Sequence, residues 1–313
     1  MAIVKPALMD FSDKRFSMII CGSPGIGKTT LALSAPNPVL VDFDGGVSRV
    51  RAQHRKDTIV AATYEEVLKD VEGLDIREYD TVIIDTGGSF VTYLQEWAKR
   101  QSPSNRRKDG GISQQGFGAV KQEFVQFTNR LKYALGKNVI YIFHTVEEKN
   151  KDGDIVQRLM CEGSAKNIVW QPCDFGCFLD VSGGSRTAGF SPTEQHFAKG
   201  CHGITGQIAV PTLGADTPNT FLTELFERAK ANIAAESTAF EEEKAAYQAT
   251  MEKGAATIAS IVDCATAETA SAEISGTPNA LTSKRELRAA LKARLKEVGV
   301  QWSKEAGAYV TVE

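Results

Sequence analysis

A glycine-rich segment near the start of the chain carries residues suited to holding phosphate. Residues 22–29 read Gly-Ser-Pro-Gly-Ile-Gly-Lys-Thr, which satisfies the pattern G-x-x-x-x-G-K-[ST]. Glycines let such a loop turn several backbone N–H groups toward an anion, and a following helix adds its positive dipole end. Lys28 is expected to reach the outer phosphates of a nucleotide, and the Thr29 hydroxyl to ligate Mg²⁺. The residues expected to contact the nucleotide are Gly22, Ser23, Pro24, Gly25, Ile26, Gly27, Lys28, Thr29 and Thr30.

Polar residues that follow apolar runs are candidates to complete this chemistry. Asp85 ends the run "TVIID", and we expect it to hold Mg²⁺ together with Thr29. Asp42 and Asp44 lie at the end of the run "PVLVDF", and both are candidates to orient or deprotonate a water in line with the terminal phosphate; Asp44 is favoured. The alternative is that Asp44 only caps the turn at residues 45–46. His144, near the end of "NVIYIFHT", is predicted to sense the terminal phosphate, or else to be a structural histidine.

Short apolar runs alternate with amphipathic stretches of helical length, and these elements must position the polar residues. Strands are predicted at 17–21, 38–43, 80–85 and 138–145. Helices are predicted after Lys28 and at 64–74, 89–101 and 120–135. Strands separated by helices at this rhythm indicate an α/β fold, with a mostly parallel sheet covered by helices on both faces.

The chain of 313 residues is long enough for one large domain and a smaller one. A long helix is predicted over residues 220–253. Beyond it, a capping box at residues 283–286 opens another helix, and residues 298–312 read as a β-hairpin. We therefore predict a core at residues 1–230 and a small α+β unit at residues 231–313.

Composition restricts the partners and the compartment. The formal net charge of -3 argues against nucleic-acid binding through overall positive charge, so any such contact must come from local basic patches. No apolar run approaches the ~18 residues of a membrane span, so a cytoplasmic protein with no membrane partner is expected. The six cysteines lie dispersed in apolar segments and are predicted to be free thiols. A zinc site formed by Cys173, Cys177, Cys201 and His202 is the alternative for four of these positions.

Parts of the sequence also fit two other classes of phosphate-binding protein. Residues 85–88 read "DTGG", which fits the D-x-x-G pattern of a GTPase, but guanine recognition also needs N-K-x-D. The nearest run, at residues 150–153, has glycine where that aspartate belongs, so a GTPase is disfavoured. A small-molecule kinase stays open because residues 105–111 could form an arginine-rich lid, although Asp44 and the long C-terminal extension fit it poorly.

The whole arrangement resembles the RecA-like recombinase ATPases, and more specifically the phage-encoded, Sak-type single-strand annealing ATPases, often described only as phage nucleotide-binding proteins. The resemblance covers residues 17–211 and rests on "CGSPGIGKTT", "LVDFDGG", "TVIIDT", "YIFHT" and "HFAKG". It implies a RecA-like P-loop ATPase that uses ATP and Mg²⁺ in DNA recombination or annealing.

The resemblance also assigns roles to single residues. The family's water-activating acid maps onto Asp44. Aspartate stands here in place of the usual glutamate, and because its side chain is one methylene shorter, slow hydrolysis is expected. The polar residue after a later strand maps onto His144 or Thr145. A lysine that reaches the nucleotide of a neighbouring subunit maps onto Lys199, which implies a homo-oligomer with shared active sites.

In RecA-like folds two loops face single-stranded DNA, and here they are residues 101–118 and residues 147–154. The first supplies Arg106, Arg107, Lys108 and Phe117, which suit phosphate contact and base stacking by a mobile loop. A surface loop without a ligand is the alternative. The predicted partners are single-stranded DNA, further copies of the chain and a single-strand-binding protein, in the host cytoplasm. The alternative function is a nucleotide-gated assembly or loader ATPase that does not bind DNA directly.

Overall fold

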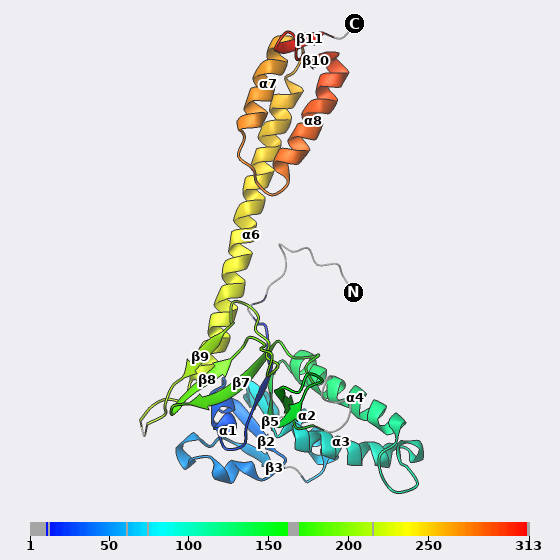
Figure 1. Ribbon diagram of the computed structural model, residues 1–313, viewed down its shortest axis with the longest axis vertical. Helices are drawn as coiled ribbons and strands as arrows, with labels where there is room; N and C mark the ends of the chain where they lie inside the picture. The colour runs from blue at the N-terminus through cyan, green and yellow to red at the C-terminus, as the bar shows by residue number, and fades with distance from the viewer. Residues whose placement is uncertain are drawn as a thin grey trace. The chain divides into compact units, whose positions relative to one another are not determined.

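The computed structural model describes residues 11, 13–60, 62–73, 75–161, 169–214 and 216–311. These residues divide into two compact units, Phe11–Asn232 and residues 233–311. Figure 1 shows the elements of both units, coloured along the chain.

The first unit is built on a sheet whose central strands are parallel. Their order is β3-β2-β4-β5-β1-β7, and the antiparallel strands β8 and β9 continue the sheet beyond β7. The strands are β1 (Ser17–Gly22), β2 (Pro38–Asp42), β3 (Thr58–Val60), β4 (Thr81–Asp85), β5 (Asn138–Lys149), β6 (Ile155–Leu159), β7 (Phe175–Ser182), β8 (Ser185–Gly189) and β9 (Gln207–Val210). β6 pairs only with the outer half of β5, as a hairpin. β1, β2 and β4 are buried along their whole length, which explains why they read as continuous apolar runs.

Helices cover both faces of this sheet. One face packs against α2 (Tyr64–Glu72), α3 (Gly87–Gln101) and α4 (Gln114–Asn129), whose buried residues share one core with β2, β4 and β5. The other face carries α1 (Lys28–Ala32) and the first part of α6 (Phe221–Ala259), where the ring of Phe226 lies 5.3 Å from that of Phe16. Short turns occur at η2 (Gly46–Arg49), η3 (Ala52–His54), η4 (Asp75–Glu78), η5 (Pro103–Asn105) and η6 (Arg130–Ala134). The α/β fold predicted from the sequence is confirmed.

The second unit combines helices with a hairpin. It contains the remainder of α6, then α7 (Cys264–Gly276), α8 (Ser283–Val298), β10 (Val300–Ser303) and β11 (Ala308–Thr311). Leu287 is buried against Ile258 and Ile274, and Val300 is buried against Ile261. The predicted C-terminal helices and hairpin are confirmed.

The capping box predicted at residues 283–286 is wrong. Ser283 is the first residue of α8 and not its N-cap, which is Thr282 and makes no side-chain cap. The Ser283 hydroxyl instead accepts a hydrogen bond from the preceding Ala280 amide at 3.0 Å. Glu286 accepts a hydrogen bond from the Tyr247 hydroxyl at 2.7 Å. A capping box opens α7 instead, between Asp263 and Thr266.

Asp174 connects three segments at the start of the central strands. Its Oδ2 accepts hydrogen bonds from Lys132 Nζ at 2.6 Å and from the Ser17 amide at 2.9 Å, and Lys14 lies 3.5 Å from its Oδ1. Burial by itself raises the pKa of Asp174, but the bonds from Lys132 and Ser17 and the charges of both lysines outweigh it and hold the pKa below its ordinary value.

We predict that Asp174→Ala lowers the free energy of unfolding by about 2 kcal/mol at pH 7, because the nearly buried Lys132 ammonium loses its counter-ion. The folded-state pKa of Asp174 lies below the unfolded value, so this stabilisation is present above pH ~4 and is lost as the pH falls through the folded pKa. Urea unfolding at pH 7 and at lower pH measures both effects. The matched control is Asp180→Ala in β7, the strand that directly follows Asp174, where the side chain is exposed. Equal losses for the two variants would contradict the prediction.

Candidate functional site

The glycine-rich segment forms a tight loop between the end of β1 and the start of α1. Gly25 and Gly27 have φ values of +80° and +96°, a left-handed conformation that favours glycine, and Gly27 is the N-cap of α1. A Cβ on Gly22 would lie 2.5 Å from the Leu179 carbonyl oxygen. Glycine is therefore required both for the turns of the loop and for its close approach to β7.

Lys28 points back under this loop. Its Nζ donates hydrogen bonds to the carbonyl oxygens of Gly22 at 3.0 Å and Ser23 at 2.8 Å, and it lies 3.0 Å from His144 Nδ1. Burial lowers the pKa of Lys28 to about 8, although the charge of Asp85 opposes this shift. The ammonium is thus largely desolvated, and backbone carbonyls and one imidazole serve as its nearest partners.

His144 reaches Lys28 because β5 pairs with β1 in a register that sets His144 opposite Gly22. Burial and then the Lys28 charge lower the pKa of His144. The imidazole is therefore neutral at pH 7, and its Nδ1 accepts a hydrogen bond from the Lys28 ammonium while Nε2 carries the ring hydrogen.

The side chains of Thr29 and Asp85 are in contact beside the loop. Thr29 Oγ1 donates a hydrogen bond to Asp85 Oδ2 at 2.7 Å. Burial raises the pKa of Asp85 to about 6, and the charges of Asp44 and Asp42 add to this effect, whereas the bond from Thr29 and the charge of Lys28 oppose it. Mg²⁺ prefers oxygen ligands such as the Thr29 hydroxyl and the Asp85 carboxylate. A divalent cation bound there would also offset the repulsion between Asp85 and the nearby carboxylates of Asp42 and Asp44. The residues present therefore fit Mg²⁺.

The two acids that follow β2 have different roles. Asp42 is buried, and its carboxylate accepts hydrogen bonds from the amides of Gly46 and Val47, both at 2.9 Å. Asp42, and not Asp44, therefore caps the turn at residues 45–46. Asp44 is exposed and lies 3.4 Å from Arg49 Nη2, and its charge also reaches Asp85 and His144. This leaves the Asp44 carboxylate near the loop and accessible to water.

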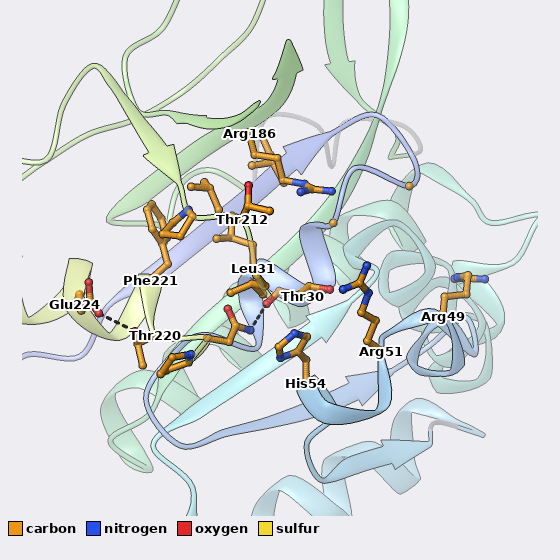
Figure 2. Close-up of a pocket in the computed structure, with 18 residues that line it drawn as sticks. Thr30, Leu31, Arg49, Arg51, His54, Arg186, Thr212, Thr220, Phe221 and Glu224 are labelled. Carbon is orange, nitrogen blue, oxygen red and sulfur yellow. Dashed lines mark hydrogen bonds between the residues drawn. The ribbon is translucent and has the colours of Figure 1, made fainter. Parts of the chain in front are cut away.

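A cavity of about 390 Å³ opens beside the loop, along α1 (Figure 2). Its walls combine apolar side chains such as Leu31, Pro211 and Phe221 with polar ones such as Thr30 and His54. At the start of α6, Thr220 Oγ1 donates a hydrogen bond to Glu224 Oε1 at 2.7 Å, and Asn219 Nδ2 donates one to the Thr30 carbonyl at 2.8 Å. The volume and the mixed lining suit a nucleoside.

Arg186 was missed by the sequence reasoning. It lies on β8 and lines the cavity, and its Nε donates a hydrogen bond to the Ile26 carbonyl at 2.9 Å. Ile26 and Arg186 are 160 positions apart, and they meet only because β7 pairs with β1 and β8 pairs with β7. No local spacing in the sequence could have indicated this contact.

Comparison with known proteins places this arrangement in a family. A family model described as an AAA domain matches residues 14–202, which include the loop, Asp85, His144 and Arg186. The chain belongs to the AAA domain family. It therefore carries a P-loop ATPase domain. A search of curated proteins found none that matches the chain. In the described part of the chain, no helix is long and apolar enough to cross a bilayer.

Lys199 lies apart from the loop of its own AAA domain. It pairs with Gly176 near the start of β7, whereas the loop follows the end of β1, which runs parallel to β7. Its Nζ donates a hydrogen bond to the Cys173 carbonyl at 2.6 Å. The structure thus does not bring Lys199 to Lys28 of the same chain, and the predicted role toward a neighbouring subunit stays a prediction.

The cysteines of the AAA domain give no support to the zinc alternative. Burial raises the pKa of Cys173 to about 12, and its Sγ donates a hydrogen bond to the Val169 carbonyl at 3.3 Å. Cys177 is also buried, and burial raises its pKa as well. Among the residues that the structure describes, no group of three or more histidine, cysteine or acidic side chains could hold a metal ion.

The loop predicted at residues 101–118 is shorter than expected. α3 continues to Gln101, and α4 starts directly after Ser113, whose hydroxyl accepts a hydrogen bond from the Gly116 amide at 3.1 Å. Phe117 therefore lies half-buried in the first turn of a helix, and its placement in a loop is wrong. The second loop is shorter too, because β5 runs on to Lys149 and pairs with β6.

The basic residues of the first loop stay together on an exposed turn. Arg106 pairs with Ile112 across the turn, and Arg106, Arg107 and Lys108 are exposed. Arg107 forms an ion pair with Asp109, which offsets part of the positive charge.

We predict that Asp85→Asn abolishes the strengthening of ATP binding by Mg²⁺, because the amide removes the charged oxygen that holds the cation beside Thr29. ATP affinity in the presence of a chelator should stay within about threefold of wild type, since Lys28 and the loop amides remain. Calorimetric titration with and without Mg²⁺ measures both values. Asp70→Asn, on the exposed face of α2, is the charge-matched control. An undiminished Mg²⁺ effect in Asp85→Asn would contradict the assignment.

Proposed function

We propose that this AAA domain binds Mg²⁺-ATP and hydrolyses it while acting on single-stranded DNA, in recombination or annealing of phage type. The observation that carries the nucleotide part is the convergence of Lys28, Thr29, Asp85 and His144 at one loop. The DNA part rests on the exposed basic turn and on the resemblance in sequence.

The loop binds the phosphates with its backbone amides, and Lys28 exchanges its carbonyl partners for phosphate oxygens. The negative charge of the phosphates favours the charged form of Lys28 and so offsets the effect of burial on its pKa. The cavity along α1 accepts the base and sugar, since it begins at Gly25 and Gly27 and extends past Thr30.

Hydrolysis uses the residues around the outer phosphates. Thr29 and Asp85 hold Mg²⁺, which when bound neutralises charge on the phosphate oxygens. Asp44 accepts a hydrogen bond from the attacking water and orients it. The ring of His144 lies beside the Lys28 ammonium and contacts the outer phosphate once Lys28 turns to it. The short reach of Asp44 makes the reaction slow.

Single-stranded DNA binds at the turn that carries Arg106, Arg107 and Lys108. With a formal net charge of -3, the chain depends on such a local patch for contact with a polyanion. A second copy of the chain places Lys199 toward the neighbouring nucleotide and completes the oligomeric site.

We predict that single-stranded DNA raises the ATPase rate and that the double variant R106A/R107A loses most of this stimulation. DNA affinity of the double variant should also depend less on salt. In a plot of the logarithm of affinity against the logarithm of salt concentration, its slope should be about 1.4 shallower than that of wild type, because two phosphate contacts are lost. The double variant K69A/R77A removes two other exposed cations and is the matched control.

Lys28→Ala controls for the nucleotide site, because it should abolish ATP hydrolysis with or without DNA. An ATPase that ignores single-stranded DNA would contradict the DNA role and favour a nucleotide-gated loader. A phosphorylated small-molecule product would favour a kinase.

A further inference from the structure

Arg186 presents a guanidinium to the phosphate loop from a strand that the sequence motif does not include. In β8, Arg186 pairs with Val181 of β7 on one side and with Val210 of β9 on the other. This position between two strands fixes its backbone. The bond from Nε to the Ile26 carbonyl then fixes the guanidinium against the loop.

The guanidinium has no anionic partner within the described residues. Arg186 is half-buried, and the Ile26 carbonyl is the one hydrogen-bond partner it has in that part of the chain. A guanidinium keeps its charge at every physiological pH, and a partly desolvated charge is costly without a counter-ion. Its remaining N–H groups are therefore available to an anion.

Arg186 and Lys28 approach the loop from opposite sides. β5, which carries His144 beside the Lys28 ammonium, flanks β1 on one edge, and β7 with β8 flanks it on the other. A Cβ placed on Gly27 would lie 3.4 Å from Arg186 Nε and 4.0 Å from Nη2. Arg186 and Thr30 both line this cavity, and Figure 2 labels them among its walls.

We propose that Arg186 binds the inner phosphates of the nucleotide, within the same chain, while Lys28 binds the outer ones. In a loop of this type the amides hold the α- and β-phosphates and the lysine reaches the β- and γ-phosphates, so a cation on the far side from the lysine meets the inner pair. The fork of a guanidinium suits two phosphate oxygens at once. The inference rests on the proposed nucleotide site.

The test is the affinity of ATP, ADP and adenosine for wild type, R186Q, R186K and the exposed control R77Q, measured by calorimetry. R186Q should weaken ATP and ADP by the same factor, about tenfold or more, and leave adenosine unchanged. R186K should recover part of the loss, because it keeps the charge but not the fork. The ATP concentration that half-saturates the ATPase should rise by a similar factor in R186Q, because the lost contact weakens nucleotide binding.

Wild-type affinity of R186Q for both nucleotides would overturn the proposal. A loss confined to ATP, together with a collapse of the maximal rate, would also overturn it, because Arg186 would then act on the outer phosphate. A wild-type protein that binds neither ATP nor ADP would instead refute the nucleotide site itself. Equal unfolding temperatures of R186K and wild type show that the fold is intact.

Discussion

A lysine ammonium buried at the end of the central strand is the interaction on which this site depends. Lys28 is only 4 % exposed, and taking a charge out of water is costly unless partners replace the water. Two loop carbonyls and the neutral His144 supply that replacement, and the nearby Asp85 carboxylate favours the charged form. Because the carbonyls and the imidazole carry no negative charge of their own, a phosphate anion can replace them as the partner of the Lys28 ammonium.

The parallel sheet makes this arrangement possible. β1, β4 and β5 run in the same direction, and their register brings His144 of β5 level with Gly22 at the end of β1 and close to Asp85 at the end of β4. The antiparallel strands that follow β7 then return the chain toward the other side of the loop, where Arg186 meets Ile26. Cations from two separate regions of the chain therefore approach one loop, and one of them, Arg186, also lines the cavity along α1.

The residues predicted from the sequence are those whose position follows from local spacing. The glycines and Lys28 belong to one short motif, and Asp85 and His144 end apolar runs that had to be neighbouring parallel strands. The role of Arg186 could not be predicted, because its position depends on which strand pairs with β1 on the side opposite β5. Pairing between strands that are distant in the chain leaves no periodic pattern in the sequence.

The sequence also could not show which of two neighbouring residues of similar chemistry has a given role. Asp42 and Asp44 carry the same side chain and are two residues apart, and only the folded turn shows that the amides of Gly46 and Val47 bind Asp42. Similarly, the resemblance predicted one loop over residues 101–118, but the Ser113 cap starts α4 within that range and places Phe117 in the helix.

The most direct test of the account is a crystal structure of the protein with Mg²⁺ and a non-hydrolysable ATP analogue. We predict phosphate density against the backbone amides of residues 25–29, with Lys28 Nζ turned from the Gly22 and Ser23 carbonyls to a phosphate oxygen at ~2.8 Å. A loop that keeps Lys28 on those carbonyls while the analogue is absent or bound elsewhere would contradict it.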